Sequence, residues 1–212
     1  MLNNLLLKIY LLPIILLSLS VHELSHGIAA YKLGDTTARD MGRLTLNPLA
    51  HLDVFGTLAM MFFGFGWAKP VPVNFSRLKY KRLGPIIVAI AGPLSNVFIA
   101  LLCYVVFEFI FYNTGSYDGF FQSYLASAVT LNATLAAFNM LPVPPLDGSK
   151  VVISLLPERA QYKVYRYEPY IQLLMFALLY IGVLNPVIRR FSYLVLTWLD
   201  KTAGFIIGLI LK

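Results

Sequence analysis

Long apolar stretches separated by short basic segments dominate the pattern of this chain. Four stretches are long and apolar enough to be candidate membrane-spanning helices: residues 4–31, 83–112, 121–141 and 170–188. A fifth candidate covers residues 191–211, although it contains Asp200 and Lys201. Segment 52–66, LDVFGTLAMMFFGFG, contains three glycines and is short for a helix that must cross ~30 Å of hydrocarbon.

The positions of Lys and Arg predict how these stretches are oriented. Basic residues gather before and after residues 44–66 and again after residue 141, whereas the loop at residues 112–119 contains none. By the positive-inside rule, the three basic segments are cytoplasmic and the loop at 112–119 lies outside. This topology requires residues 44–66 to enter the membrane and return. The alternation in WAKPVPVNF, residues 67–75, then favours an edge strand over a helix.

Composition supports a membrane protein. Of the 212 residues, 58% are hydrophobic and 13% are charged, whereas soluble domains have about 45–50% apolar and about 25% charged residues. The sequence predicts an all-α polytopic membrane protein with about five to six transmembrane helices and a re-entrant, partly β-like segment. We expect residues 1–212 to form a single domain, because no polar stretch is long enough for a core of its own. The net charge of +7 is interpreted as membrane topology and predicts no nucleic-acid partner.

The first apolar stretch ends in HELSH, residues 22–26. His22 and His26 are four residues apart, so a helix presents both imidazoles on one face, where they can bind one ion. Glu23 lies beside them. This is the HExxH arrangement, in which two His ligate zinc and the Glu acts as general base. Polar packing between helices is the alternative, but ionisable residues in a membrane span are usually functional.

A catalytic zinc normally has three protein ligands, so another residue must join the two histidines. The candidates in or near apolar segments are His51, Asp53, Glu108 and Asp147. Glu108 lies at the far end of its span. Asp147 follows the inner end of stretch 121–141, at the expected depth of the histidines, within NMLPVPPLDGSK. Prolines end a helix there and Gly148 permits a tight turn, so Asp147 is the favoured ligand.

Taken together, HELSH at 22–26 and NMLPVPPLDG at 139–148 resemble the site-2 protease family of intramembrane zinc metalloproteases. The segment GPLSN, residues 92–96, is similar to the G-x-x-x-N element of that family, and GRLTLNPLAHLDVFGT with GWAKPVPVN resembles its compact bacterial and archaeal members. The resemblance covers about residues 10–155, followed by C-terminal helices at 168–212. No PDZ insertion interrupts it.

The resemblance implies a zinc metalloendopeptidase with one Zn²⁺ per chain, held by His22, His26 and Asp147, and with Glu23 as the catalytic base. Its expected substrates are single-span membrane proteins, cleaved in or near their transmembrane segments, as in regulated intramembrane proteolysis. The expected location is a bacterial or archaeal plasma membrane, embedded in the lipid bilayer, with the active site toward the cytoplasmic side.

Three other polar residues are candidates for supporting roles. Asn96 and Asn139 lie on apolar segments, where they would stabilise the oxyanion, hold the substrate backbone, or form hydrogen bonds between helices. His51 would contact substrate or pack within a loop. The alternative functions are a transporter, which should show internal repeats that are not found here, and an inactive scaffold, against which the intact Glu23 argues.

Overall fold

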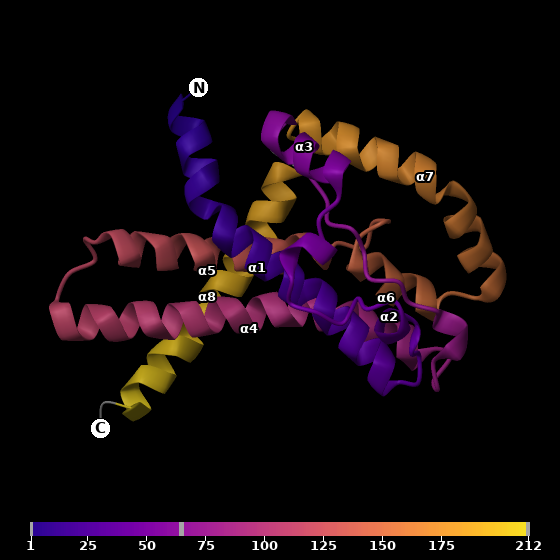
Figure 1. Cartoon of the computed structure of the whole chain (residues 1–212), viewed down its shortest axis with the longest axis horizontal. Coiled ribbons are helices and arrows are strands. Elements are labelled where there is room, and N and C mark those ends of the chain that lie inside the picture. Colours follow the sequence, from indigo (N-terminus) through magenta and orange to yellow (C-terminus); the bar gives the residue numbers. More distant parts are fainter. Residues whose placement is uncertain (1, 64–65, 211–212) are drawn as a thin grey trace.

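The computed structural model describes residues 2–63 and 66–210, and within these ranges the chain is helical or irregular (Figure 1). The long helices are α1 (Leu2–Lys32), α4 (Leu83–Thr114), α5 (Phe120–Asn139), α7 (Glu158–Tyr180) and α8 (Asn185–Ile210). The short helices are α2 (Thr37–Asp40), α3 (Val54–Phe63) and α6 (Asp147–Leu155), with 3-10 turns at Pro48–Ala50 and Phe75–Arg77.

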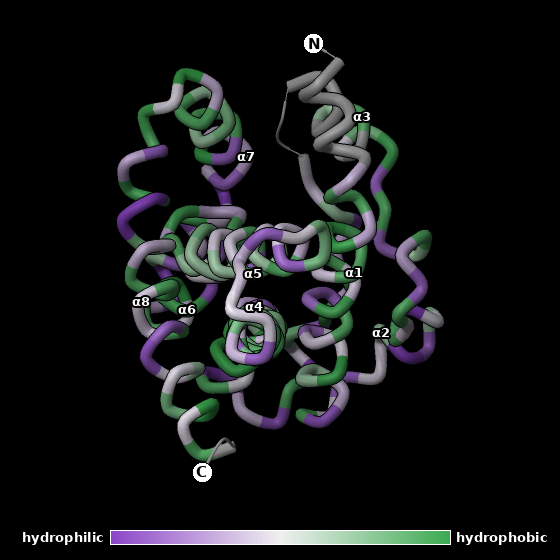
Figure 2. Tube along the Cα trace, turned by 90° about the vertical axis from the view of Figure 1, so that its left-hand side faces the viewer, coloured by the Kyte–Doolittle hydropathy of each residue, from purple (hydrophilic) through white to green (hydrophobic). Residues whose placement is uncertain are grey.

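Helix α4 is the central element. Figure 2, which looks along α4, shows α1 on one side of it, α6 and α8 on the other, and α5 above. The buried cluster where α4, α5 and α8 meet consists of Ala100, Val129, Ala133 and Leu199. The two alanines allow close approach of the helix backbones, which is how helices associate when lipid removes the usual hydrophobic driving force.

Helix α1 crosses α4 on the side opposite α8 (Figures 1 and 2). Near the C-terminal end of α1, Ala30 packs with Leu78 and with Val88 of α4 in a second buried cluster. At the other end of the described α1 side chains, the ring of Tyr10 makes edge-on contacts with Phe120 and Tyr124 of α5. These contacts fix the path of α1, and therefore of the HELSH segment, against α4.

The described residues contain fewer candidate membrane spans than the five to six predicted. Two helices are long and apolar enough to cross a membrane, Tyr10–Lys32 and Leu83–Thr114, or three spans if the bent pair α7 and α8 is counted as one. Helix α5 falls short because polar side chains are distributed along it: Gln122, Ser123, Ser127, Thr130 and Asn132. Of these, Gln122 and Asn132 are buried within the protein, and all five keep the mean hydropathy of the segment low.

The predicted boundaries of the last two spans, 170–188 and 191–211, are wrong. Helix α7 starts twelve residues earlier, at Glu158, and ends at Tyr180; α8 starts at Asn185 and is inclined to α7 by 85°. The break occurs at Gly182, whose φ of 80° is the left-handed conformation that terminates helices. The apolar run continues through this glycine, so hydropathy alone does not reveal the break.

The two ends of segment 52–66 lie side by side. Leu52 forms an isolated antiparallel bridge with Ala68, and the Lys69 N–H donates to the His51 carbonyl at 2.8 Å. Between them the chain forms α3 and turns back. Because its ends are joined, this segment returns to the level at which it starts.

The predicted edge strand at residues 67–75 is not observed. Residues 69–74 have no regular secondary structure, Phe75 begins a 3-10 turn, and among the described residues the segment pairs as a strand only through the Leu52–Ala68 bridge. Pro70 and Pro72 lack N–H groups, which prevents a continuous ladder. Residues 67–74 are called the strap below. The N–H groups of Val71 and Asn74 instead donate to carboxylate side chains.

The hairpin form of residues 44–66 predicts the sidedness of the flanking loops. The Lys79 N–H donates to the Leu33 carbonyl at 2.9 Å, so the loops before and after the hairpin touch. With the one native cysteine removed by Cys103→Ala, single cysteines at Met41 and Ser76 should react with a membrane-impermeant maleimide from the same face of the membrane. A cysteine at Asp118, beyond the roughly 48 Å of α4, should react from the opposite face.

The measurement compares labelling of intact cells with labelling of inverted vesicles. Labelling of Met41→Cys and Ser76→Cys from opposite faces would show that the segment crosses the membrane.

Candidate metal centre

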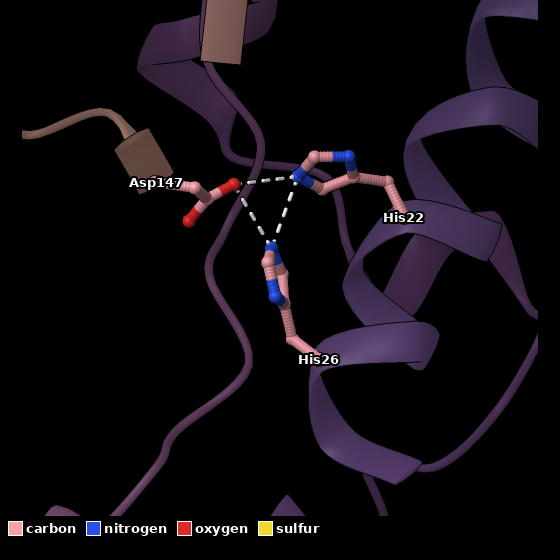
Figure 3. A group of neighbouring side chains, drawn as sticks. All are labelled: His22, His26 and Asp147. Carbon is pink, nitrogen blue, oxygen red and sulfur yellow. Dashed lines mark hydrogen bonds and ion pairs between the residues drawn. The ribbon is translucent and has the colours of Figure 1, made fainter. Parts of the chain in front are cut away.

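Two imidazoles from α1 and one carboxylate from α6 point toward one another (Figure 3), and both helices contact α4. His22 and His26 project from one face of α1 with their Nε2 atoms 3.1 Å apart. Asp147, the first residue of α6, places its Oδ2 atom 3.1 Å from each Nε2. Ligand atoms around a tetrahedral zinc, at about 2.0–2.1 Å from the ion, are about 3.3 Å from one another. The spacing of these three atoms fits a single zinc ion.

The hydrogen bonds of the two Nδ1 atoms determine which nitrogen of each ring carries the proton. His26 Nδ1 lies 2.7 Å from the Val88 carbonyl oxygen, which can only accept, so Nδ1 carries the proton. His22 Nδ1 lies against Oδ1 of Asn96, whose Nδ2 donates to Asn132 at 3.0 Å. In the neutral imidazoles, both Nε2 atoms therefore present lone pairs.

Three hydrogen-bond acceptors thus converge, and all three residues are buried, with 5–7% of their surface exposed. Buried acceptors that face one another without a donor repel, and a cation removes the repulsion. The described residues therefore fit a metal ion by their chemistry as well as by their spacing. The outer hydrogen bonds hold each ring in the orientation that a metal needs.

One stripe of α4 lies directly under the two imidazoles. Val88, Gly92 and Asn96 follow one another at four-residue intervals and share a helix face. The first and last accept hydrogen bonds from the histidines, and the middle one supplies space. A Cβ atom on Gly92 would lie 2.6 Å from His22 Nε2 and closer still to His26 Nε2. A larger residue at position 92 is therefore incompatible with this arrangement of the ligands.

Asp147 is placed by the turn that precedes α6. The helix α5 ends at Asn139, and the proline-rich segment up to residue 146 leads into α6. A Cβ atom on Gly148 would overlap the carbonyl groups of Met140 and Leu141, so only glycine permits the chain to pass this closely. The second carboxylate oxygen, Oδ1, accepts a hydrogen bond from Lys150 Nζ at 2.9 Å. This ammonium group offsets part of the negative charge buried beside the metal position.

Glu23 is held by the strap. Its Oε2 atom accepts a hydrogen bond from the Val71 N–H at 2.7 Å. This is a backbone donor, so the position of the Glu23 carboxylate depends on the path of the strap. The hydrogen bond engages Oε2 and fixes the orientation of the whole carboxylate group, including the second oxygen, Oε1.

The strap is held in turn on both sides of Val71. Arg43 Nη2 donates to the carbonyls of Lys69 and Pro70, at 3.0 and 3.2 Å, and the Asn74 N–H donates to Asp35 Oδ2 at 2.6 Å. Asp35 is fully buried. Burial by itself would raise the pKa of its carboxyl group, but the hydrogen bonds from Thr37 and Asn74 outweigh burial and hold that pKa below its ordinary value. The anionic carboxylate is thereby retained as an acceptor for the strap.

Among the described residues, the remaining predicted ones are not part of the group of three ligand atoms. His51 is buried, with Nε2 bonded to the Thr45 carbonyl at 2.8 Å, and Asn139 donates to Leu135 of its own helix at 3.0 Å. Asp53 accepts a hydrogen bond from the Gly56 N–H at the start of α3. Glu108 is twelve residues along α4 from Asn96, about 18 Å away.

Asn96 is the supporting residue that the structure brings to the site, where it orients His22; this geometry favours an orienting role over direct support of substrate. Sequence reasoning missed Asn132, Lys150 and the Val71 N–H. The fully buried Asn132 lies in an apolar segment, a signal that was available, and Lys150 lies one helical turn from Asp147. No sequence signal identifies a backbone donor such as that of Val71.

Fold and site together define a helical membrane protein with a buried His-His-Asp metal centre. The profile of peptidase family M50 matches residues 110–182. A protein of Bacillus subtilis (strain 168) named "Putative zinc metalloprotease YwhC" is 41% identical over 170 residues, which cover 76% of this chain and 75% of that protein. The chain belongs to peptidase family M50, the site-2 protease family, and is a zinc metalloprotease.

More distant relatives bear similar names. "Putative zinc metalloprotease Rip2" of Mycolicibacterium smegmatis is 27% identical over 197 residues, covering 89% of this chain and 72% of that protein. "Zinc metalloprotease MJ0392" of Methanocaldococcus jannaschii is 26% identical over 160 residues, 76% of this chain and 38% of that protein. No solved structure matches the chain.

The close approach of α4 to the ligands predicts that Gly92→Ala weakens zinc binding. The added methyl group must displace either the imidazoles or α4, so we expect the zinc dissociation constant to rise at least about tenfold, which corresponds to about 1.4 kcal/mol. The measurement is zinc per chain during titration with a competing chelator. Gly204→Ala on α8 is the matched control, because a Cβ there meets nothing within 4 Å. Equal zinc affinity in both variants would contradict the geometry described here.

Proposed function

We propose that this metalloprotease hydrolyses peptide bonds in or near the transmembrane segments of single-span membrane proteins. The observation that carries the proposal is the convergence of three buried acceptor atoms, from His22, His26 and Asp147, on one point of a helix that can itself span a membrane. His26 lies about 9 Å along α1 from Lys32, the last residue of that candidate span. This position lies within the candidate membrane-spanning length of α1, which supports a substrate that is itself embedded in the membrane.

The chemistry divides between the bound ion and the residues of this chain. Zinc held by His22, His26 and Asp147 would lower the pKa of a coordinated water to about 7 and polarise the peptide carbonyl. Glu23 would take the proton from the attacking water and transfer it to the leaving amine nitrogen. Its Oε2 is held by the Val71 N–H, so Oε1 is the oxygen that would carry the proton. The Val88 carbonyl and Asn96 keep the ring protons on Nδ1 throughout.

We further propose that the site faces the cytoplasm of a bacterial or archaeal cell and serves regulated intramembrane proteolysis. The basic loops around the hairpin and after residue 141 support this orientation through the positive-inside rule. The relatives named above are bacterial and archaeal proteins, which supports the plasma membrane as the location. Substrates would be single-span proteins within the same bilayer.

Glu23→Gln separates metal binding from catalysis. The amide has nearly the same shape but cannot accept the water proton, so zinc content should remain one per chain while the cleavage rate falls roughly 10²- to 10⁴-fold. The measurement is quantitative proteomics of transmembrane fragments in cells that carry this variant, with His22→Ala as a control that should lose zinc. Cleavage by Glu23→Gln at the rate of the unmodified enzyme would remove Glu23 from the mechanism.

Val71→Pro tests the role of the strap. Proline deletes the N–H donor in a segment that already contains Pro70 and Pro72, and it also replaces the buried Val71 side chain, which the control below accounts for. A hydrogen bond to a charged group contributes about 1.5–3 kcal/mol, so we expect kcat to fall roughly 10- to 100-fold, with KM and zinc content little changed. Val71→Ala, which keeps the N–H and shortens the side chain, is the matched control. Equal kcat in the two variants would show that the donor does not position Glu23.

A further inference from the structure

The first half of α7, residues 158–170, presents a basic and aromatic face to the outside. Arg159, Lys163 and Arg166 are spaced by four and three residues and therefore share one helix face. All three are exposed, and none forms an ion pair or side-chain hydrogen bond within the described part of the chain. Tyr162 and Tyr167 flank them and are 69% and 54% exposed.

These side chains line a hollow of about 680 Å³ on the surface. Its lining consists of the three basic residues, the two tyrosines and Glu158, which leaves an excess of two positive charges. In Figure 1 this part of α7 arches outward at the right, away from the α4 and α5 pair. Within the described chain, no other helix supplies a residue to the lining.

The change in composition along α7 indicates where this face lies relative to the membrane. The second half of the same helix becomes apolar, with Leu173 and Leu174 exposed and Met175 buried. Helices α7 and α8, joined by a bend of 85°, are together long and apolar enough to cross a membrane. The change from charged and tyrosine-rich to apolar within one helix is the pattern of a segment that passes from the headgroup layer toward hydrocarbon.

We propose that the face formed by Arg159, Tyr162, Lys163, Arg166 and Tyr167 binds the phosphate headgroups of anionic phospholipids. The basic groups supply the charge that anionic headgroups attract, and tyrosine is enriched at the membrane–water boundary because its ring is apolar and its hydroxyl is polar. The hollow is large enough for a headgroup and open toward the surface. This inference does not depend on the catalytic chemistry.

The test measures lipid binding to the purified full-length protein in detergent. Phosphatidylglycerol should be retained in native mass spectrometry and should raise the thermal unfolding midpoint, and phosphatidylcholine should do so much less. Each basic residue near an anionic surface contributes about fivefold in affinity, so Arg159→Gln, Lys163→Gln and Arg166→Gln together should weaken phosphatidylglycerol binding roughly 100-fold. Each single substitution should weaken it about fivefold, which preserves the test if the triple variant is unstable.

A matched variant removes the same charge elsewhere. Lys79, Lys81 and Arg82 are exposed in the loop before α4; their replacement by Gln should leave most of the phosphatidylglycerol binding intact. A loss as large as that in the α7 variant would show a general effect of net charge and overturn the proposal. Equal binding of phosphatidylcholine and phosphatidylglycerol would also overturn it.

Two further ligands distinguish other occupants of the hollow. Inorganic phosphate at millimolar concentration should not displace phosphatidylglycerol; displacement, with stabilisation by phosphate alone, would identify a site for free phosphate. A polyglutamate peptide should not bind in an α7-dependent way. If it does and phosphatidylglycerol does not, the face recognises acidic protein segments, and the lipid proposal fails.

Discussion

The convergence of three acceptor atoms without a proton between them is the constraint on which this structure depends. The Nε2 atoms of His22 and His26 and Oδ2 of Asp147 are 3.1 Å apart in a buried region. Their lone pairs face inward because Nδ1 of His26 must donate to the Val88 carbonyl. With both imidazoles neutral, such a group is stabilised by a cation, so metal binding and the packing of α1, α4 and α6 are energetically coupled.

Residues along one face of helix α4 hold the two imidazoles in position. Val88 and Asn96 orient the two imidazoles, and Gly92 between them provides the space that the imidazoles occupy. Asn132 on α5 donates no proton to the site but fixes the amide of Asn96 through its own Oδ1. The orientation of His22 therefore depends on helix α5 as well, through two amide side chains that are completely buried.

The strap connects the metal centre to the surface loops. Pro70 and Pro72 remove alternate N–H groups, and the N–H groups of Val71 and Asn74 are left to donate to the carboxylates of Glu23 and Asp35. A regular strand would have satisfied these donors with backbone carbonyls. Here the carboxylate of Glu23, within α1, and that of Asp35, just after α1, take that place, so the position of Glu23 and the path of the strap determine each other.

The sequence by itself determined the helical membrane character and the three residues whose side chains converge as candidate metal ligands, because HELSH requires only the local geometry of a helix and the LDG turn only proline and glycine chemistry. It did not determine the number of spans, since hydropathy does not register the break at Gly182 or the polar packing of α5. Nor did it identify the strap contact or the partners of Asn96. Those depend on backbone groups and on residues 36 to 74 positions apart, which only the packing of the helices brings within hydrogen-bonding distance.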